Sequence, residues 1–248
     1  MCTAQTSTRW ICNQPNRQAS KRMFCFPYAG AGASVFRNWS NQLLPEVEIC
    51  PIQLPGREGR MAEPLFTKLS PLVEALSKAL LPYLDLPFTF FGHSMGALVS
   101  FEVARFLQSH YNISPKHLFV SGRQAPQLRS SKPPIHQLPD NLFIEELRRY
   151  NGTPEMVLQN HELLSLFLPI LRADFAINDT YTHTNMPLNC PITAFGGLQD
   201  SGVSLTDIAA WRYQTNSDFS MHMFPGDHFF IKNEREQLLL LIAETMYE

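Results

Sequence analysis

The feature that most constrains the fold of this chain is the pentapeptide Gly-His-Ser-Met-Gly at residues 92–96. An apolar aromatic run at residues 88–91 precedes it, and a stretch with helical character, residues 97–104, follows at once. A Gly-x-Ser-x-Gly pentad between a strand and a helix is typical of a sharp turn that exposes its serine. The pattern therefore predicts that Ser94 is a nucleophile, with an ordinary strand–turn–helix connection as the alternative.

The rest of the chain alternates short apolar runs with amphipathic stretches. We expect strands at 23–26, 47–52, 117–122, 190–197 and 219–224, and helices at 69–83, from the pentad to about 109, at 204–213 and at 233–247. Ser70 is expected to cap the first of these helices, with Pro71 at the first helical position. This alternation predicts an α/β fold with a mostly parallel central sheet that is flanked by helices on both faces.

One long segment interrupts the alternation. Several prolines follow residue 123, and helical patterns then come at 140–150, from 153 onward and at 162–177, the last one kinked or divided near Pro169. We expect residues 125–187 to form a helical lid inserted between strands, although a plain helical layer on the sheet would fit the same pattern. Residues 1–21 are polar and predict a loose leader, which leaves 22–248 for the α/β domain.

Composition excludes several classes of function. The net charge of −2 is spread without blocks of like charge, so nothing indicates nucleic-acid binding. The five cysteines are scattered and contain no Cys-x-x-Cys pair, and no histidines have the spacing of a zinc site. No apolar run is long enough to span a bilayer, and no signal peptide is evident. We expect a cytoplasmic monomer that needs no metal or cofactor and binds no membrane.

A serine nucleophile needs a base, and the base needs a carboxylate that orients it. His228 follows the last strand and a Pro-Gly turn, where a loop can reach Ser94, whereas His222 lies inside that strand and is assigned a structural role. Asp200 follows the preceding strand and is our choice for the acid. Asp207 is second, because it falls where the next helix begins.

Two backbone N–H groups are needed to bind the oxyanion of a tetrahedral intermediate. Met95, directly after the serine, is expected to supply one of them. The loop at 27–32 is rich in small residues and is expected to supply the other, with Ala29 as first choice and Tyr28 as second. This loop lacks a Gly-Lys-Ser/Thr ending, so it does not indicate a phosphate site.

Five segments together resemble the type II thioesterases, the free-standing editing enzymes of polyketide and nonribosomal peptide synthases. They are Phe-Pro-Tyr-Ala-Gly at 26–30, Leu-Pro-Gly-Arg-Glu at 54–58, the pentad, Leu-Pro-Ile-Leu-Arg-Ala-Asp at 168–174 and Pro-Gly-Asp-His-Phe-Phe at 225–230. Asp227 departs from the glycine that many relatives carry there; we expect it to cap its loop without loss of activity. Arg57 and Arg172 match two of the segments, and either loop bracing or substrate contact would explain them.

The resemblance implies an α/β-hydrolase fold and a serine thioesterase with the triad Ser94, Asp200 and His228. Its substrates would be acyl groups on the 4′-phosphopantetheine arm of an acyl or peptidyl carrier protein, and its role the editing or regeneration of stalled or misprimed synthase modules. The alternatives are a medium-chain acyl thioesterase that acts with a fatty-acid synthase, a general carboxylesterase and a non-catalytic binding module. Carrier proteins are typically acidic, so basic residues of the predicted lid are a candidate docking rim, with scattered surface charge as the alternative: Arg123, Arg129, Lys132, Arg148 and Arg149.

Overall fold

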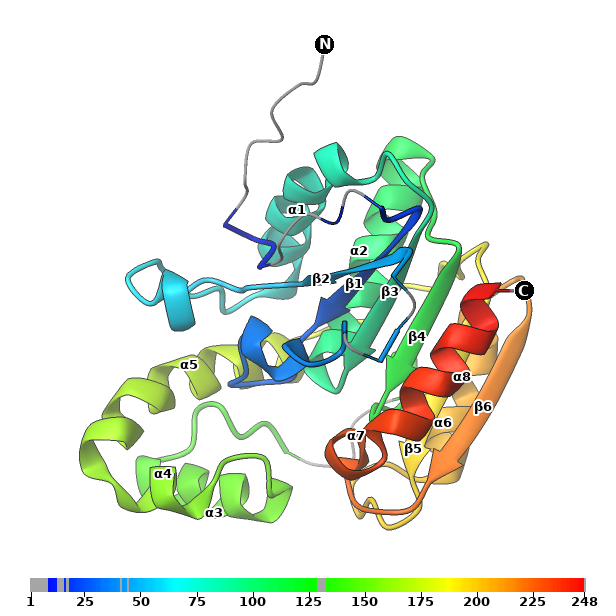
Figure 1. Ribbon diagram of the computed structural model, residues 1–248. Coiled ribbons are helices and arrows are strands. Elements are labelled where there is room, and N and C mark those ends of the chain that lie inside the picture. Colours follow the sequence, from blue (N-terminus) through cyan, green and yellow to red (C-terminus); the bar gives the residue numbers. More distant parts are fainter. Residues whose placement is uncertain are drawn as a thin grey trace.

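A six-stranded parallel sheet runs through the centre of the computed structural model, which describes residues 9–12, 16, 18–40, 42–43, 45–128 and 133–247 (Figure 1). The strand order is β2-β1-β3-β4-β5-β6, and every neighbouring pair is parallel. The strands are β1 (Lys21–Phe26), β2 (Val47–Pro51), β3 (Phe88–His93), β4 (His117–Ser121), β5 (Ile192–Gly197) and β6 (Phe219–Phe224). The predicted α/β fold is therefore confirmed.

The sheet separates two hydrophobic cores because successive side chains of a strand point to opposite faces. Phe24 and Phe90 pack into the core that contains α1 (Leu69–Leu80) and α2 (Met95–Tyr111). Cys25 and Phe91 pack into the other core with α8 (Arg235–Tyr247), which lies across the sheet in Figure 1. Strands buried on both faces explain why their sequences are almost continuously apolar.

The ends of the helices differ from the prediction in three places. Helix α1 begins at Leu69, two residues before the first helical position expected at Pro71, because the Leu69 side chain is buried in the core; Ser70 therefore lies inside the helix and the predicted cap is wrong. The predicted helix at 204–213 is divided into α6 (Leu205–Ala209) and the 3₁₀ helix η4 (Ala210–Gln214). A short helix α7 (Phe230–Asn233) precedes α8. Further 3₁₀ turns are η1 (Ala33–Phe36), η2 (Glu58–Arg60) and η3 (Leu81–Tyr83).

Between β4 and β5 the described residues form three helices, in a segment that we call the helical insertion (residues 125–187). They are α3 (Asp140–Tyr150), α4 (Glu155–Gln159) and α5 (His161–Asp179), and Figure 1 shows them grouped beyond one end of the sheet. Helix α5 continues through Pro169 rather than dividing there. The insertion has a small core of its own, built from Ile135, Phe143, Leu147, Leu158 and Leu171.

Part of the predicted loose leader lies against the sheet instead. Ile11 forms an antiparallel bridge with Ile52, and the amide of Cys12 donates to the Pro51 carbonyl at 3.0 Å. Because β2 is the edge strand, this bridge covers the end of an otherwise open edge. Residues 1–8, 13–15 and 17 of the leader lie outside the described residues. In the part of the chain that the structure describes, no helix combines the length and the apolar character needed to cross a membrane.

Candidate active site

Ser94 lies in the sharp turn between β3 and α2, with φ 55° and ψ −114°. A non-glycine residue with positive φ is strained and persists only where its surroundings enforce it. A Cβ atom on Gly92 would overlap the Gly96 carbonyl, and one on Gly96 would overlap the carbonyl oxygen of Phe26. The amide of Ser94 donates to the Ser121 carbonyl at 2.7 Å, which ties the turn to β4. Both glycines of the pentad are therefore required by close backbone contacts.

The structure brings Ser94, His228 and Asp200 into one hydrogen-bonded chain. The Nε2 atom of His228 is 3.0 Å from Ser94 Oγ, and its Nδ1 atom is 2.7 Å from Asp200 Oδ2. The three residues follow β3, β6 and β5, so they meet at the carboxyl edge of the parallel sheet. This edge is where open α/β sheets build their sites.

The Asp200 carboxylate is held in its charged form. Burial raises the pKa of this carboxyl, but hydrogen bonds from His228 and from the amides of Gly202 (2.8 Å) and Val203 (3.1 Å) together lower the pKa below its ordinary value. An ionised Asp200 accepts the Nδ1–H of His228, which leaves Nε2 as an acceptor facing Ser94. The arrangement can therefore remove a proton from the serine.

The loop that follows β1 lies beside the N-terminus of α2. A Cβ atom on Gly96 would lie 2.8 Å from the Pro27 carbonyl oxygen, which shows how closely the two segments approach. The amide of Ala31 closes the turn on the Tyr28 carbonyl at 3.0 Å. Among the described residues, no acceptor is found for the amides of Ala29 and Met95, the two predicted oxyanion donors. Both amides are therefore free to bind a ligand oxygen.

The competing acids and bases have other partners. Asp207 forms a capping box with Ser204 at the start of α6, and Asp227 Oδ1 accepts from the Phe229 amide at 2.8 Å. Asp227 thus caps its own loop, as predicted. His222 lies within β6, with its ring 5.9 Å from that of Phe195.

His93 is a site residue that the sequence reasoning passed over. It is fully buried, its Nδ1 atom is 2.9 Å from Ser121 Oγ, and its ring lies 5.2 Å from that of His228. Burial lowers the pKa of His93 well below its ordinary value, and the charge of His228 lowers it further. The feature of the sequence that could have indicated a site role for His93 is its position inside the pentad. The neutral imidazole of His93 therefore packs beside His228 in the hydrogen-bonded chain.

The helical insertion contacts both loops that flank Ser94. A Cβ atom on Gly152 would lie 2.7 Å from the Phe229 ring, and Nδ2 of the Asn151 side chain donates to Asp227 Oδ2 at 3.2 Å. On the other side, Leu171 of α5 packs directly on Gly30. The insertion therefore lies next to the loop at 27–32, which we call the oxyanion loop after its predicted role, and next to the loop at 225–229 that carries His228.

The basic residues predicted as a docking rim form ion pairs or hydrogen bonds within the chain where the structure describes them. Arg148 and Arg149 form ion pairs with Glu155 and Glu146. Arg123 points inward and donates to Asn178 Oδ1 at 2.7 Å, and burial lowers its pKa to about 10. Arg129 and Lys132 lie outside the described residues. The three described residues of this set therefore already have partners within the chain.

Arg172 supports the bracing interpretation. Its guanidinium donates to the His136 carbonyl at 2.7 Å, pairs with Asp140 and stacks over the Phe143 ring at 4.5 Å. All of these contacts lie within the helical insertion.

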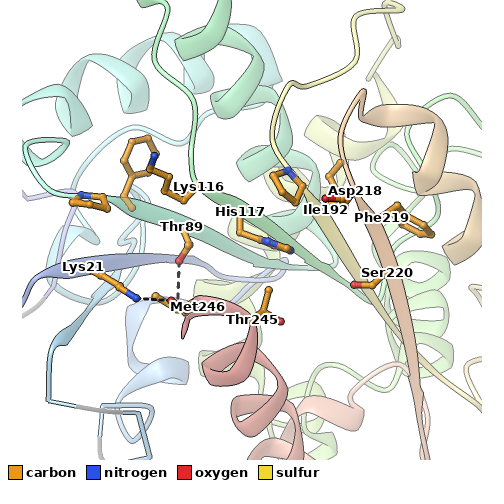
Figure 2. Close-up of a pocket in the computed structure, with 13 residues that line it drawn as sticks. Lys21, Thr89, Lys116, His117, Ile192, Asp218, Phe219, Ser220, Thr245 and Met246 are labelled. Carbon is orange, nitrogen blue, oxygen red and sulfur yellow. Dashed lines mark hydrogen bonds between the residues drawn. The ribbon is translucent and has the colours of Figure 1, made fainter. Parts of the chain in front are cut away.

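A cavity of about 740 Å³ lies at the opposite end of the sheet, at the amino ends of the strands (Figure 2). Two of its polar side chains, His117 and Ser220, have Thr193 as a common partner: His117 Nε2 is 2.8 Å from Thr193 Oγ1, which in turn is 2.8 Å from Ser220 Oγ. Lys21 at its rim donates to the Met246 carbonyl (Figure 2). None of the predicted site residues lines this cavity. Across the described residues, no group of three or more His, Cys, Asp or Glu side chains could hold a metal ion.

Comparisons with known proteins agree with this geometry. The family model described as a thioesterase domain matches residues 21–245. The gramicidin S biosynthesis protein GrsT of Aneurinibacillus migulanus is 50% identical over 240 residues, which cover 96% of this chain and 94% of that protein. The solved structure of the type II thioesterase BorB from the borrelidin biosynthetic cluster superposes with a TM-score of 0.87 at 34% identity, over 97% of this chain and 99% of that one. The medium-chain S-acyl fatty acid synthase thioesterase of Rattus norvegicus is 32% identical, over 89% of this chain and 85% of that protein.

Proposed function

We propose that this chain, which belongs to the thioesterase domain family, hydrolyses acyl thioesters carried on the 4′-phosphopantetheine arm of an acyl or peptidyl carrier protein. The observation that carries the proposal is the hydrogen-bonded chain from Ser94 through His228 to Asp200 at the carboxyl edge of the sheet. The relation to a gramicidin S biosynthesis protein supports a role beside a nonribosomal peptide or polyketide synthase. There the enzyme would edit or regenerate stalled or misprimed modules.

The proposed reaction begins when His228 Nε2 takes the proton of Ser94 Oγ as this oxygen attacks the thioester carbonyl carbon. The carbonyl oxygen becomes an oxyanion, which the amides of Met95 and Ala29 bind, while charged Asp200 stabilises the imidazolium. Collapse of this intermediate breaks the carbon–sulfur bond, and the pantetheine thiol leaves with the proton from His228. Water activated by His228 then releases the acid from the acyl-enzyme.

In this proposal residues 125–187 act as the lid over the acyl chamber. The contacts of the helical insertion with Gly30 and Phe229 support that role, since they lie on both sides of Ser94. A cytoplasmic location is supported by the free thiols of Cys12, Cys25 and Cys190.

The first test is Ser94→Ala. Turnover of an acyl-loaded carrier protein is expected to fall by about 10⁴-fold or more, because the nucleophile is lost. Labelling by a fluorophosphonate probe should disappear as well, while the circular dichroism spectrum stays that of the wild type. Ser109→Ala, on the exposed side of the same helix, is the matched control and should keep full activity. Full turnover by Ser94→Ala would contradict the proposal.

The substrate class is tested with one acyl group presented in three forms: on a carrier protein, on coenzyme A and as a p-nitrophenyl ester. A carrier-directed thioesterase should show its highest kcat/KM on the carrier-bound form. A preference for the oxygen ester would indicate a general carboxylesterase. A preference for medium-chain acyl groups on a fatty-acid carrier would indicate the fatty-acid synthase alternative.

A further inference from the structure

A buried ion pair connects the helical insertion to the loop after β2. Arg57 Nη1 is 2.6 Å from Asp174 Oδ2, and Arg57 Nη2 is 2.8 Å from Asp174 Oδ1. The two side chains are only 5% and 1% exposed. Two parallel N–H···O bonds fix both distance and orientation, which a single contact would not do. Residues 117 positions apart in the chain are thereby held rigidly together.

The same pair also holds the oxyanion loop. Asp174 Oδ2 accepts a hydrogen bond from the Gly30 amide at 2.7 Å, and Arg57 Nη1 donates to the Ala31 carbonyl at 3.3 Å. Gly30 and Ala31 are the two residues that directly follow Ala29. The ion pair therefore controls the backbone on the carboxyl side of a predicted oxyanion donor.

Two further contacts make this loop dependent on α5. Gly30 has a φ of +78°, which favours glycine, and a Cβ atom there would lie 2.6 Å from Leu171 Cδ2. Leu171 precedes Asp174 by one helical turn, so both side chains reach the loop from the same face of α5. On the other side of Ala29, the Tyr28 ring packs on Phe229 with centroids 5.1 Å apart. The loop is thus clamped on both sides of the Ala29 amide.

Stability alone does not require a charged pair at this place. A buried ion pair loses much of its attraction to desolvation, and apolar residues of similar volume often serve equally well. An apolar pair, however, would leave the Gly30 amide without its acceptor. The distinctive contribution of Asp174 is that one carboxylate binds the arginine and the oxyanion loop at the same time.

We infer that Asp174 and Arg57 are positioning residues for the oxyanion hole, which they couple to α5 of the helical insertion. The carboxylate of Asp174 orients the Gly30 peptide, and this sets the direction of the neighbouring Ala29 N–H toward the oxygen that forms above Ser94. The inference rests on the proposed function, because it assumes that Ala29 stabilises an oxyanion.

The test compares Asp174→Asn with Asp179→Asn. Asp179 lies on the same helix and its carboxylate also accepts three hydrogen bonds, from the amides of Ile135 and His136 and from His136 Nδ1, but none of them involves the oxyanion loop. An asparagine at 174 has no charge and carries an NH₂ donor in place of one carboxylate oxygen, so this donor must face either Arg57 Nη2 or both Arg57 Nη1 and the Gly30 amide, which are themselves donors. The two variants therefore make the same chemical change, and only one of them disturbs the loop.

Each variant is measured for kcat and KM on an acyl-pantetheine thioester, and for binding of two inhibitors with the same acyl chain. The first inhibitor is a trifluoromethyl ketone, to which Ser94 Oγ adds so that the ketone oxygen becomes an oxyanion and the serine proton passes to His228. The second is a non-hydrolysable pantetheine amide that resembles the substrate. For Asp174→Asn we expect kcat to fall by about 10² with KM changed by less than about threefold, as for a misplaced catalytic donor. Affinity for the ketone should fall by a similar factor, and affinity for the amide should not change.

Asp179→Asn should stay within about threefold of the wild type in all four measurements. Equal loss of affinity for the ketone and the amide in Asp174→Asn, or behaviour identical to Asp179→Asn, would overturn the inference. If Asp174→Asn does not fold, Arg57→Lys replaces it. This variant keeps the Gly30–Asp174 bond and loses the two-point geometry, so kcat and ketone affinity should each fall about tenfold, and unchanged values would overturn the inference. If the wild type neither hydrolyses the thioester nor binds the ketone, the proposed function itself fails.

Discussion

Two histidines with lowered pKa values, the fully buried His93 and the partly buried His117, contribute to the acid response of the fold. His117 stacks on Phe119 with ring centroids 4.4 Å apart, and burial lowers its pKa to about 4. His93 lies beneath the site with its pKa lowered in the same direction. Unfolding exposes both rings, which then bind protons near their ordinary pKa of about 6.5. Stability must therefore fall as the pH drops from about 6.5 toward 4, because the unfolded chain takes up protons that the folded chain does not. Asp200 adds to the loss at lower pH, since its lowered pKa stabilises the fold only while the carboxyl is charged.

We predict that His117→Gln flattens this acid dependence. A shift from about 6.5 to about 4 corresponds to at most about 3 kcal/mol of unfolding free energy between neutral pH and pH 4. Urea unfolding at pH 7, 6, 5 and 4.5 measures it, and the variant should lose less stability than the wild type over this interval. His161→Gln, an exposed change on α5, is the control and should follow the wild-type curve. Identical slopes for all three proteins would disprove the assignment to His117.

At the scale of elements, the start of α6 determines how the segment after Asp200 is held. Asp200 accepts the amides of Gly202 and Val203, and Ser204 then caps the helix. In this capping box the Asp207 amide donates to Ser204 Oγ at 3.2 Å, and the Ser204 amide donates to Asp207 Oδ2 at 2.8 Å. Two of the free N–H groups at the helix start are thereby satisfied. Asp207, the second candidate for the catalytic acid, thus stabilises α6, the helix that follows the first candidate, Asp200.

Replacing Ser204 with alanine should lower the free energy of unfolding by about 1 kcal/mol, the usual cost of losing a cap. Ser70→Ala is the matched control, because Ser70 is exposed inside α1 and makes no cap bond. This second change should stay within about 0.5 kcal/mol of the wild type. Urea unfolding of the two variants at neutral pH provides the comparison, and equal costs at the two positions would refute the distinction.

The whole molecule consists of a sheet with two cores and a helical insertion with a third, smaller one. The insertion exposes several large apolar side chains, namely Leu142, Met156, Leu163 and Leu166. Helix α5 joins the two parts: its buried residues all follow Pro169, from Ile170 to Ile177, while the residues before Pro169 are at least partly exposed. Elements with few buried contacts open at lower free energy than the core of a protein.

The rate of amide hydrogen exchange should therefore differ between the helical insertion and the sheet. Amides of α3, α4 and the first half of α5 are expected to exchange at least about tenfold faster than those of β1, β3 and α2, since they open without disturbing the sheet. Protection should rise along α5 once Pro169 is passed. Exchange followed by peptide mass spectrometry resolves these segments, and uniform protection across the insertion and the sheet would contradict the prediction.

Local signals in the sequence were sufficient for the strands, for most helices and for the turn at Ser94. The elbow could be predicted because its two glycines and the serine are neighbours in the chain, and steric overlap within the turn excludes larger residues. The positions of Asp200 and His228 also followed, since the carboxyl ends of parallel strands must meet at one edge.

Packing alone decided the remaining features. Ser70 carried a good capping signal, but burial of Leu69 moved the start of the helix. The ion pair of Arg57 with Asp174 joins residues 117 positions apart, and no local pattern indicates that one carboxylate would also hold the Gly30 amide. By itself, then, the sequence determined the fold class and the candidate nucleophile, acid and base, because backbone sterics and hydrophobic periodicity act between near neighbours. Tertiary structure decided how the oxyanion loop is held and where the helical insertion rests, because those contacts exist only once distant segments have packed together.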